Sequence, residues 1–432
     1  MIGRERRDRG GTGLIGAGQA TRDIVPPFIK RAVSNLNPYM QIRRKQKIDW
    51  YVGYLLIGLL LPFTRLLGFL LRRDHSIGVA PKRIVFIKLL GLGSLIVASD
   101  AIQAMRVRFP GTRFILLTDK NIADGIAPFQ LFDEIYPINT ERLGLTFRGV
   151  TRFLLRAWSW RRLWVIDLEV YSKLTTVLAL LTLALNRAGF YLSYVPFRRF
   201  LNTHNITFDQ SVYLEDNYRY MARQVTGGDL PIFVPVIRQA ELKKPYIILN
   251  NTCSGLADVR KLPDRTFSEV VRWVLEHTDY GVALLGMPDD RDAINQLIGS
   301  EPDLRGRRER ILNFAGMAED FAAYYSFLRD KGVCLVTIDS GPLHIARKLG
   351  LPTVSIWGPT GPDNYLKIEP HEKERHLYYY LKSPCSPCVH HYETLPCGGN
   401  NFCMKNIPAA AIIAKLDELL RHLKASQPVG TS

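Results

Sequence analysis

The sequence predicts an α/β protein made of two doubly wound domains. Short β-branched runs alternate with segments of helical periodicity, and this alternation occurs in two successive series. The linker between the series, near 229–244, contains Pro231, Pro235 and a lysine pair. A chain of 432 residues fits two domains of ordinary size plus an appendage. A content of 47% hydrophobic and 22% charged residues excludes a mostly disordered or fibrous protein.

The first series opens with a strand, a glycine turn, a helix and a second strand, which together form a βαβ unit. Pro110-Gly111 interrupts the helical periodicity and separates that helix from the strand after it. We expect strands at 83–88, 113–118, 134–137 and 163–168, the glycine turn at 91–94, and helices at 95–109 and 174–188.

The second series has the same alternation and ends in one amphipathic helix. We expect strands at 245–250, 281–285, 333–338 and 353–357, and helices at 267–276, 342–349 and 409–423. The predicted domains are therefore 81–240 and 241–432. In such folds ligands bind at the carboxyl ends of the strands, where the candidate residues should lie.

The chain is strongly basic, and much of the excess lies at its start. Lys and Arg number 57 against 40 Asp and Glu, a net charge of +17. Residues 1–49 hold eleven of the cations and four of the acids, with five glycines within 10–18 and no apolar periodicity, which predicts a flexible basic arm. An anionic membrane surface is the expected partner, because no nucleic-acid motif accompanies the arm.

An apolar segment, 50–80, follows the arm. Its central part, 51–71, has 21 residues, with Arg65 as the only charge and Pro62 in the middle. Both flanks are basic, which favours a kinked helix lying in or dipping into the cytoplasmic leaflet, with Arg65 reaching the headgroups. A single transmembrane span and a buried core helix are the two alternatives.

The most informative motif follows the expected strand at 333–338. Asp339, Ser340, Gly341 and Pro342 form a helix start, because serine caps, glycine permits close approach and proline suits the first turn. Its free N–H groups make an anion site. From spacing alone, an ordinary capped helix explains the motif equally well, with His344 as a core imidazole.

At this motif the sequence resembles glycosyltransferase family 9, the heptosyltransferase-like enzymes of bacterial lipopolysaccharide assembly. DSGPLHIARKLGLPTVSIWGPTGP resembles the donor-site signature, and RIVFIKLLGLGSLIVASDAIQAMRVRFPGTRFILLT resembles the amino-terminal strand, turn and helix. The segment from VIDLEVYSK resembles the acceptor side, NTCSGLADVRKLP the phosphate loop, and NFAG also matches. The resemblance covers about 83–410 and leaves 1–82 outside.

The resemblance implies a GT-B fold, two Rossmann-like domains facing a cleft, and inverting transfer of a sugar from a nucleotide diphosphate donor without a required metal. Asp339 would face the donor sugar, Ser340, Gly341 and Pro342 would meet the diphosphate, and His344 would support that loop. The family's phosphate-loop lysine corresponds to Arg260, a cation suited to the charge that grows on the leaving diphosphate.

Further donor contacts follow from the same alignment of motifs. Lys261 stands beside Arg260. Asn251 and Thr252 occupy the places of small polar phosphate contacts, and Asp289 or Asp290 would suit the ribose hydroxyls.

The acceptor-side turn, with Lys88, Gly93 and Ser94, departs from the family pattern. The family has Asp, the proposed catalytic base, where this chain has Ser94, and a serine hydroxyl is not basic at neutral pH. General base catalysis contributes roughly 10²–10⁴ in rate. We therefore expect another carboxylate to act, with Glu169 as the first candidate and Asp119 as the second.

Four cysteines form a cluster in the second domain, namely Cys385, Cys388, Cys397 and Cys403, with His390 and His391 between them. Such a set is able to bind a structural zinc ion. Reduced thiols and disulfides are the alternatives, and a cytoplasmic location argues against stable disulfides.

The function expected from these observations is sugar transfer to a lipid-linked or lipopolysaccharide-type acceptor at the cytoplasmic face of the bacterial inner membrane, by a peripheral or monotopic enzyme. The alternative is a nucleotide-sugar-binding scaffold or regulator that has lost its base. No catalytic cofactor and no nucleic-acid partner are expected.

Overall fold

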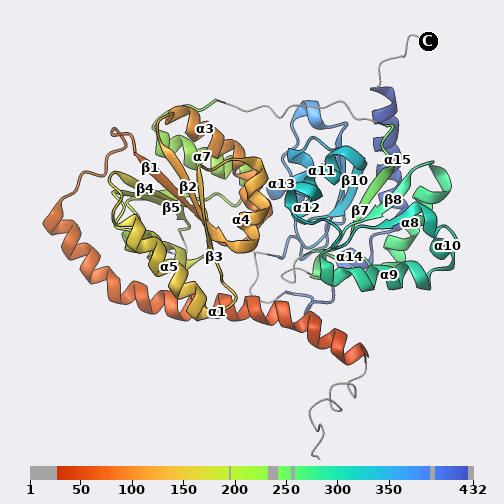
Figure 1. Ribbon diagram of the computed structural model, residues 1–432, viewed down its shortest axis with the longest axis horizontal. Coiled ribbons are helices and arrows are strands. Elements are labelled where there is room, and N and C mark those ends of the chain that lie inside the picture. Colours follow the sequence, from red (N-terminus) through yellow and green to blue (C-terminus); the bar gives the residue numbers. More distant parts are fainter. Residues whose placement is uncertain (1–26, 194–195, 232–241, 254–257, 390–394, 427–432) are drawn as a thin grey trace, which may run out of the picture. The chain divides into compact units, whose positions relative to one another are not determined.

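The computed structural model describes residues 27–193, 196–231, 242–253, 258–389 and 395–426. Residues 47–432 form one compact unit, which contains two six-stranded parallel sheets with helices packed around each (Figure 1). The predicted fold class, two doubly wound domains preceded by an apolar helix, is confirmed.

The first sheet has the strand order β3-β2-β1-β4-β5-β6. Its strands are β1 Arg83–Lys88, β2 Arg113–Asp119, β3 Glu134–Ile138, β4 Leu163–Asp167, β5 Asn186–Tyr191 and β6 His204–Thr207. Its helices are α2 Leu92–Val97, α3 Ser99–Arg108, α4 Lys120–Ile126, α5 Leu143–Ala157, α6 Lys173–Leu181 and α7 Leu214–Thr226. The central strands β1, β2 and β4 are buried on both faces, as their continuous apolar runs require.

The second sheet has the order β12-β11-β10-β7-β8-β9. Its strands are β7 Tyr246–Asn250, β8 Gly281–Leu284, β9 Ile311–Asn313, β10 Gly332–Ile338, β11 Thr353–Trp357 and β12 His376–Tyr380. Its helices are α8 Asp264–His277, α9 Arg291–Ser300, α10 Pro302–Arg305, α11 Phe321–Lys331, α12 Gly341–Lys348, α13 Pro362–Tyr365, α14 Phe402–Lys405 and α15 Ala409–Ala425. In each sheet the strand order reverses beside the first strand, which is where such folds bind ligands.

The helix expected at 174–188 was wrong in its second half. α6 ends at Leu181, and the chain then enters strand β5. Leu183 takes a positive φ of 56°, and the Thr182 hydroxyl accepts a hydrogen bond from the Ala184 N–H. A continuous apolar run fits a buried helix and a buried strand equally well. Only the pairing of β5 between β4 and β6 decides in favour of a strand.

The basic arm expected to be flexible over 1–49 is helical from Pro27 onward. Helix α1, Pro27–Leu71, is a single run that continues through Pro62. Pro27 suits a first helical turn, and the sequence has no glycine between Gly18 and Gly53. Pro38 and Pro62 lie inside the run, where each lacks the N–H of an intrahelical hydrogen bond. The glycine-rich stretch of the arm lies outside the described residues.

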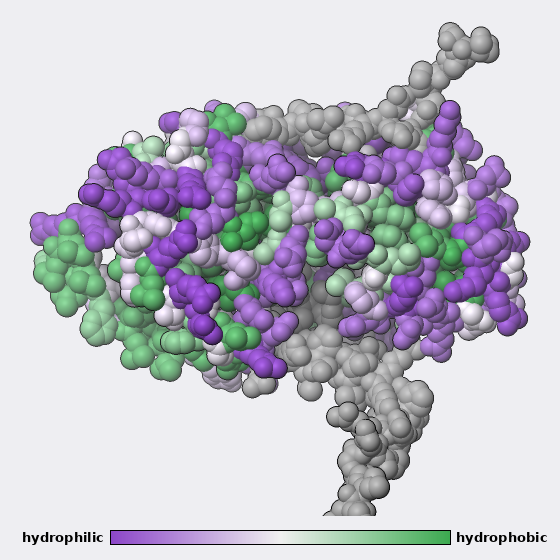
Figure 2. Space-filling view, viewed as in Figure 1, coloured by the Kyte–Doolittle hydropathy of each residue, from purple (hydrophilic) through white to green (hydrophobic). Residues whose placement is uncertain are grey.

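Within 47–71, α1 is largely exposed rather than buried. The segment Lys47–Leu71 is long and apolar enough to cross a membrane, and only 6% of its most apolar window is buried. Figure 2 shows hydrophobic residues gathered along this part of the molecule. The exposure argues against the buried core helix, which would be covered on most sides.

One narrow strip of α1 contacts the first domain. The Asp49 carboxylate accepts hydrogen bonds from the Ser172 hydroxyl and from the N–H groups of Lys173 and Leu174, at 2.7–3.0 Å. Ile57 is buried against Val177 and Leu201. Asp49 therefore satisfies the first free donors of α6 and ties that helix to α1.

We predict that Asp49→Ala lowers the stability of the protein. Two backbone donors at the start of α6 would lose their acceptor, and losing such a cap costs about 0.5–2 kcal/mol. Thermal unfolding followed by circular dichroism should show a lower midpoint, whereas Glu141→Ala, an exposed acid of the same domain, should not change it. Equal midpoints for Asp49→Ala and wild type would show that the cap contributes nothing.

Candidate active site

In the first domain the candidate residues gather at the carboxyl ends of β1 and β4. The Glu169 carboxylate accepts a hydrogen bond from Lys88 Nζ at 3.1 Å and from the N–H groups of Leu89 and Leu90 at 2.8 Å each. The Lys88 and Glu169 side chains are only 7% and 9% exposed. Burial alone would lower the pKa of Lys88, but Glu169, Tyr218 and Asp167 together outweigh burial and leave the pKa raised.

A second buried pair lies beneath the first. Asp167 and Arg198 approach to 3.4 Å, and Asp167 also accepts hydrogen bonds from the Thr175 hydroxyl and the Glu169 N–H. Burial raises the pKa of Asp167 to about 6, although Arg198 opposes the rise. The predicted base Glu169 therefore stands in a network of buried charges that positions the loop after β1.

Asp119, the second candidate base, lies at the end of β2 and caps α4. Its carboxylate accepts hydrogen bonds from the Asn121 N–H at 3.0 Å and from the Thr140 hydroxyl at 2.5 Å. Ser94 donates to the Gly91 carbonyl. Both acids thus have structural contacts, and the assignment of the base to either one stays a prediction.

The turn at 91–94 packs directly on α12 of the second domain. Gly91 has a φ of 81°, which favours glycine. A Cβ on Gly93 would lie 2.8 Å from Cδ2 of His344 and 3.7 Å from Cα of Gly341. The space beside Gly93 is therefore already filled by α12. The turn at 91–94 and the start of α12, which come from separate motifs in the sequence, meet at this point.

In the second domain the donor motif lies at the end of β10. Arg260 donates through Nη1 to the Asp339 carbonyl at 2.9 Å and to its carboxylate at 3.1 Å. The Nε of Arg260 is buried and has no hydrogen-bond partner among the residues that the structure describes. Burial lowers the pKa of His344 to about 4, although Asp339 opposes that shift, so the imidazole is neutral at physiological pH.

Ser340 does not cap α12 with its side chain, so that expectation was wrong. Its hydroxyl instead accepts a hydrogen bond from the Asn250 amide at 3.1 Å and lies 3.2 Å from the Thr337 hydroxyl, while Pro342 occupies the first turn of the helix. Among the described atoms, none would lie within 4 Å of a Cβ on Gly341. The N-terminus of α12 therefore has open space beside Gly341, while Pro342 has no N–H to donate and the Leu343 N–H donates to the Ser340 carbonyl.

Other donor-side candidates mostly hold the loop itself. The Asn251 side chain donates to the Leu262 carbonyl and accepts from its N–H, and Thr252 donates to the Asn250 side chain. Lys261 pairs with Asp258 at 3.0 Å. Residues 254–257 of this loop lie outside the described residues.

The two acids proposed for the ribose follow β8. Asp289 is exposed, and Asp290 accepts a hydrogen bond from the Met287 N–H at 2.9 Å. The charge of Asp290 contributes to the raised pKa of Lys261, so Asp290 lies near the phosphate loop. Their role toward a ribose stays a prediction.

Sequence reasoning missed two tyrosines at this site, the buried Tyr218 and the partly buried Tyr365. The pKa of Tyr218 on α7 is raised by burial, while Lys88 and a hydrogen bond with Ser94 oppose the rise. Burial also raises the pKa of Tyr365 on α13, and Asp339, Arg260 and Tyr218 are among the groups that act on it. Neither tyrosine belongs to a motif, so only the fold brings them to the site.

Cys385, Cys388, Cys397 and Cys403 form no disulfide among the residues that the structure describes. Burial raises the pKa of Cys403 to about 11, and Cys385, Cys388 and Cys397 lie near enough to affect it. Over the described residues, no group of three or more His, Cys, Asp or Glu side chains is placed to hold a metal ion. The zinc hypothesis gains no support from these residues; His390 and His391 lie outside them.

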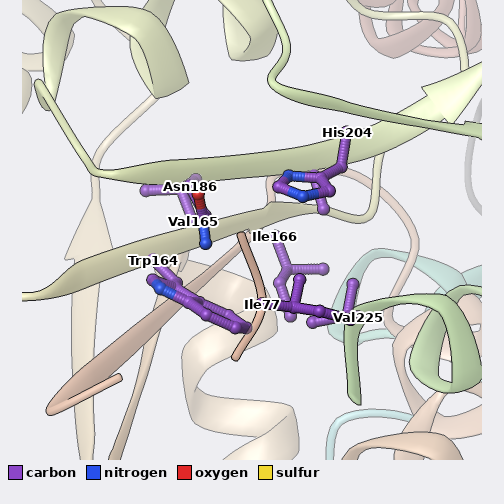
Figure 3. A pocket seen from close by; sticks show the side chains of 8 residues that line it. Ile77, Trp164, Val165, Ile166, Asn186, His204 and Val225 are labelled. Atoms are coloured by element: carbon purple, nitrogen blue, oxygen red, sulfur yellow. The ribbon is translucent and has the colours of Figure 1, made fainter. Parts of the chain in front are cut away.

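A small pocket between β4, β5, β6 and α7 is separate from this site (Figure 3). Trp164, Ile77, His204 and Val225 line it, and none of the predicted site residues does. It is mostly apolar and lies among the strands of the sheet rather than at their carboxyl ends. We interpret it as a packing gap.

The fold, two Rossmann-like domains whose turn at 91–94 and helix α12 meet, is the GT-B fold. Residues 206–397 match the family model described as glycosyltransferase family 9 (heptosyltransferase). The matched segment holds the phosphate-loop and donor-site motifs, so this comparison supports the resemblance that the sequence showed.

Individual relatives agree with this resemblance. Lipooligosaccharide heptosyltransferase 2 of Campylobacter jejuni is 30% identical over 87 residues, which are 20% of this chain and a quarter of that protein. A family 9 glycosyltransferase from Veillonella parvula superposes with a TM-score of 0.60 at 18% identity, covering 81% of this chain and 99% of that one. The ADP-heptose lipopolysaccharide heptosyltransferase II of E. coli gives 0.59 at 15% identity, covering 79% and 99%.

We predict that Lys88 and Glu169 are energetically coupled. Removing one partner of a buried ion pair leaves an uncompensated charge and costs about 3–5 kcal/mol, whereas removing both costs less. Glu169→Gln and Lys88→Met should each lower the unfolding midpoint in denaturant. The double variant should lose clearly less stability than the two losses added together, as a double-mutant cycle measures.

An additive cycle would show that the 3.1 Å contact contributes no coupling. The matched control is Lys261→Met with Asp258→Asn, an exposed pair at 3.0 Å in the second domain, for which the coupling should stay below about 1 kcal/mol.

Proposed function

We propose that this protein is an inverting glycosyltransferase that moves a heptose-like sugar from a nucleotide diphosphate donor to a lipid-linked or lipopolysaccharide-type acceptor. The observation that carries the proposal is the meeting of the α12 N-terminus, Asp339 and Arg260 with the turn at 91–94. Donors and a cation thus converge where a diphosphate leaving group gains charge.

The solved relatives support the choice of donor. An E. coli heptosyltransferase structure contains ADP, and another contains ADP-2-deoxy-2-fluoro heptose. For this chain we propose that the diphosphate meets the N–H groups at the start of α12 and the Arg260 guanidinium, while the buried Asp339 lies next to the sugar. Metal independence is part of the proposal, because Arg260 and the helix dipole supply the positive charge.

We propose that the enzyme lies on the cytoplasmic face of the inner membrane with α1 in the plane of the bilayer. The contacts of α1 with the first domain extend from Asp49 to Arg65, whose guanidinium lies 4.3 Å from the centre of the Phe200 ring. The helix rises by about 24 Å between Asp49 and Arg65, which are sixteen positions apart. A helix that lies along a polar domain for this length is suited to an in-plane position and not to a perpendicular span.

A scaffold that binds nucleotide sugars without transferring them is the second candidate. Two observations favour it: Ser94 replaces the acid of the family, and Glu169 is engaged by Lys88 and two backbone N–H groups. These contacts engage both oxygens of the carboxylate in structural hydrogen bonds.

Turnover separates the two candidates. Full-length protein in detergent is incubated with a panel of nucleotide diphosphate sugars, ADP-heptose included, and a lipopolysaccharide-type glycolipid. We expect release of the nucleoside diphosphate and glycosylated lipid for at least one donor. Donor binding by calorimetry without any product would instead identify a scaffold, and absence of binding would contradict both candidates.

We predict that Arg260→Ala weakens binding of the nucleoside diphosphate by about tenfold or more and leaves the nucleoside unchanged. A charge-assisted hydrogen bond contributes about 1.5–3 kcal/mol, and only the diphosphate would lose it. Calorimetric titration of both ligands measures the difference. Arg265→Ala, which removes a guanidinium that is 91% exposed, should affect neither ligand. Equal losses for the two ligands would remove Arg260 from the phosphate site.

A further inference from the structure

Helix α5 of the first domain and its flanks have an unusual charge composition. Residues 142–162 contain six arginines and neither Asp nor Glu. The helix buries Phe153, Leu154 and Ala157 against the sheet, which leaves the opposite side free.

The free side carries large apolar residues. Leu143, Phe147, Leu155 and Trp158 are 66%, 74%, 61% and 53% exposed. At 100° per residue, Phe147, Trp158 and Leu155 fall on one flank of the helix. Exposed apolar residues gathered in this way mark a contact surface, because monomeric soluble proteins rarely leave such patches uncovered.

Arginines occupy the neighbouring stripe. Arg148 and Arg152 are exposed, stand one turn apart, and have no ion-pair partner among the described residues. Arg156, the next in the stripe, lies 3.2 Å from Glu134. We define the α5 surface as Leu143, Phe147, Leu155, Trp158, Arg148 and Arg152.

The α5 surface is connected to the apolar helix α1 through α6. The Trp158 indole N–H donates to the Leu181 carbonyl at 2.8 Å. Leu180, beside it, packs against the buried cluster that contains Ile57 of α1. Leu181 and Leu183 are themselves exposed, at 36% and 63%. The apolar flank of α5 therefore adjoins the side of the domain on which α1 lies (Figures 1 and 2).

We propose that the α5 surface is a second membrane contact, which binds an anionic phospholipid bilayer. Arg148 and Arg152 would bind lipid phosphates, while Phe147, Leu155 and Trp158 enter the boundary between headgroups and acyl chains. A cationic stripe beside an apolar flank with a tryptophan is the pattern of a helix in a membrane interface. The inference rests on the proposed membrane association through α1 and extends it to the acceptor-side domain.

Membrane contacts at both α1 and α5 would fix the orientation of the first domain more firmly than a contact at α1 alone. α1 alone would leave the first domain free to rotate about the helix axis, whereas α5 adds a line of contact beside it. Since β1, β2 and β4 carry the acceptor-side turn and its neighbours, the α5 surface would orient these strand ends relative to the lipid surface.

The test compares full-length variants on vesicles. Arg148→Glu/Arg152→Glu removes the cationic stripe, and Phe147→Gln removes the most exposed apolar residue; both changes are on the surface. The matched control, Arg305→Glu/Arg308→Glu, makes the same change of net charge at exposed positions of the second domain. Flotation measures partitioning onto phosphatidylethanolamine–phosphatidylglycerol vesicles and onto phosphatidylcholine vesicles.

We expect Arg148→Glu/Arg152→Glu to lower partitioning onto the anionic vesicles by about tenfold or more, and to change partitioning onto phosphatidylcholine little. Phe147→Gln should lower partitioning onto both vesicle types, and the control should match wild type. If both double variants partition alike, or Phe147→Gln partitions like wild type, the α5 contact is wrong while α1 binding stands. Wild type that fails to float with either vesicle would contradict the proposed membrane association as well.

Discussion

The position of the loop after β1 in the first domain depends on the buried ion pair between Lys88 and Glu169. Lys88 ends β1 and Glu169 follows β4, so one carboxylate joins the ends of two adjacent central strands. The same carboxylate accepts the N–H groups of Leu89 and Leu90, which fixes the chain as it leaves β1. The turn that begins at Gly91 therefore starts from a defined position, and its contact with His344 depends on that position.

In the second domain, neutral hydrogen bonds hold the loops at the candidate site. In the first domain, buried ion pairs do so. Asn250, Thr337 and Ser340 form a network of amide and hydroxyl groups beneath the α12 N-terminus. One ion pair, Arg260 with Asp339, stands above that network, and the Asp339 carbonyl also binds the guanidinium. A cation held by two acceptors of one residue loses little further freedom on meeting a phosphate, which favours tight binding.

The arginine-rich helix α5 and the exposed apolar helix α1 contact the same helix, α6. α1 and α5 are both linked to α6, the first through Asp49 and the second through Trp158. The start of α6 also lies close to the buried charges, since Arg198 donates to the Ser172 carbonyl and pairs with Asp167. The surfaces proposed to contact a membrane and the buried charges beside the turn at 91–94 are thus connected through one short helix.

The sequence by itself determined the class of fold, the central strands and the donor motif. β1, β7, β10 and β11 are apolar runs bounded by turn residues, and local composition is enough to specify a strand that is buried on both faces. The tertiary structure alone decided the part of the first sheet beyond β4, where β5 replaced half of an expected helix. It also decided the surroundings of Glu169, because its partners Lys88 and Leu90 lie 81 and 79 residues away in the chain. Pairing between distant segments depends on non-local contacts, which no local pattern of residues records.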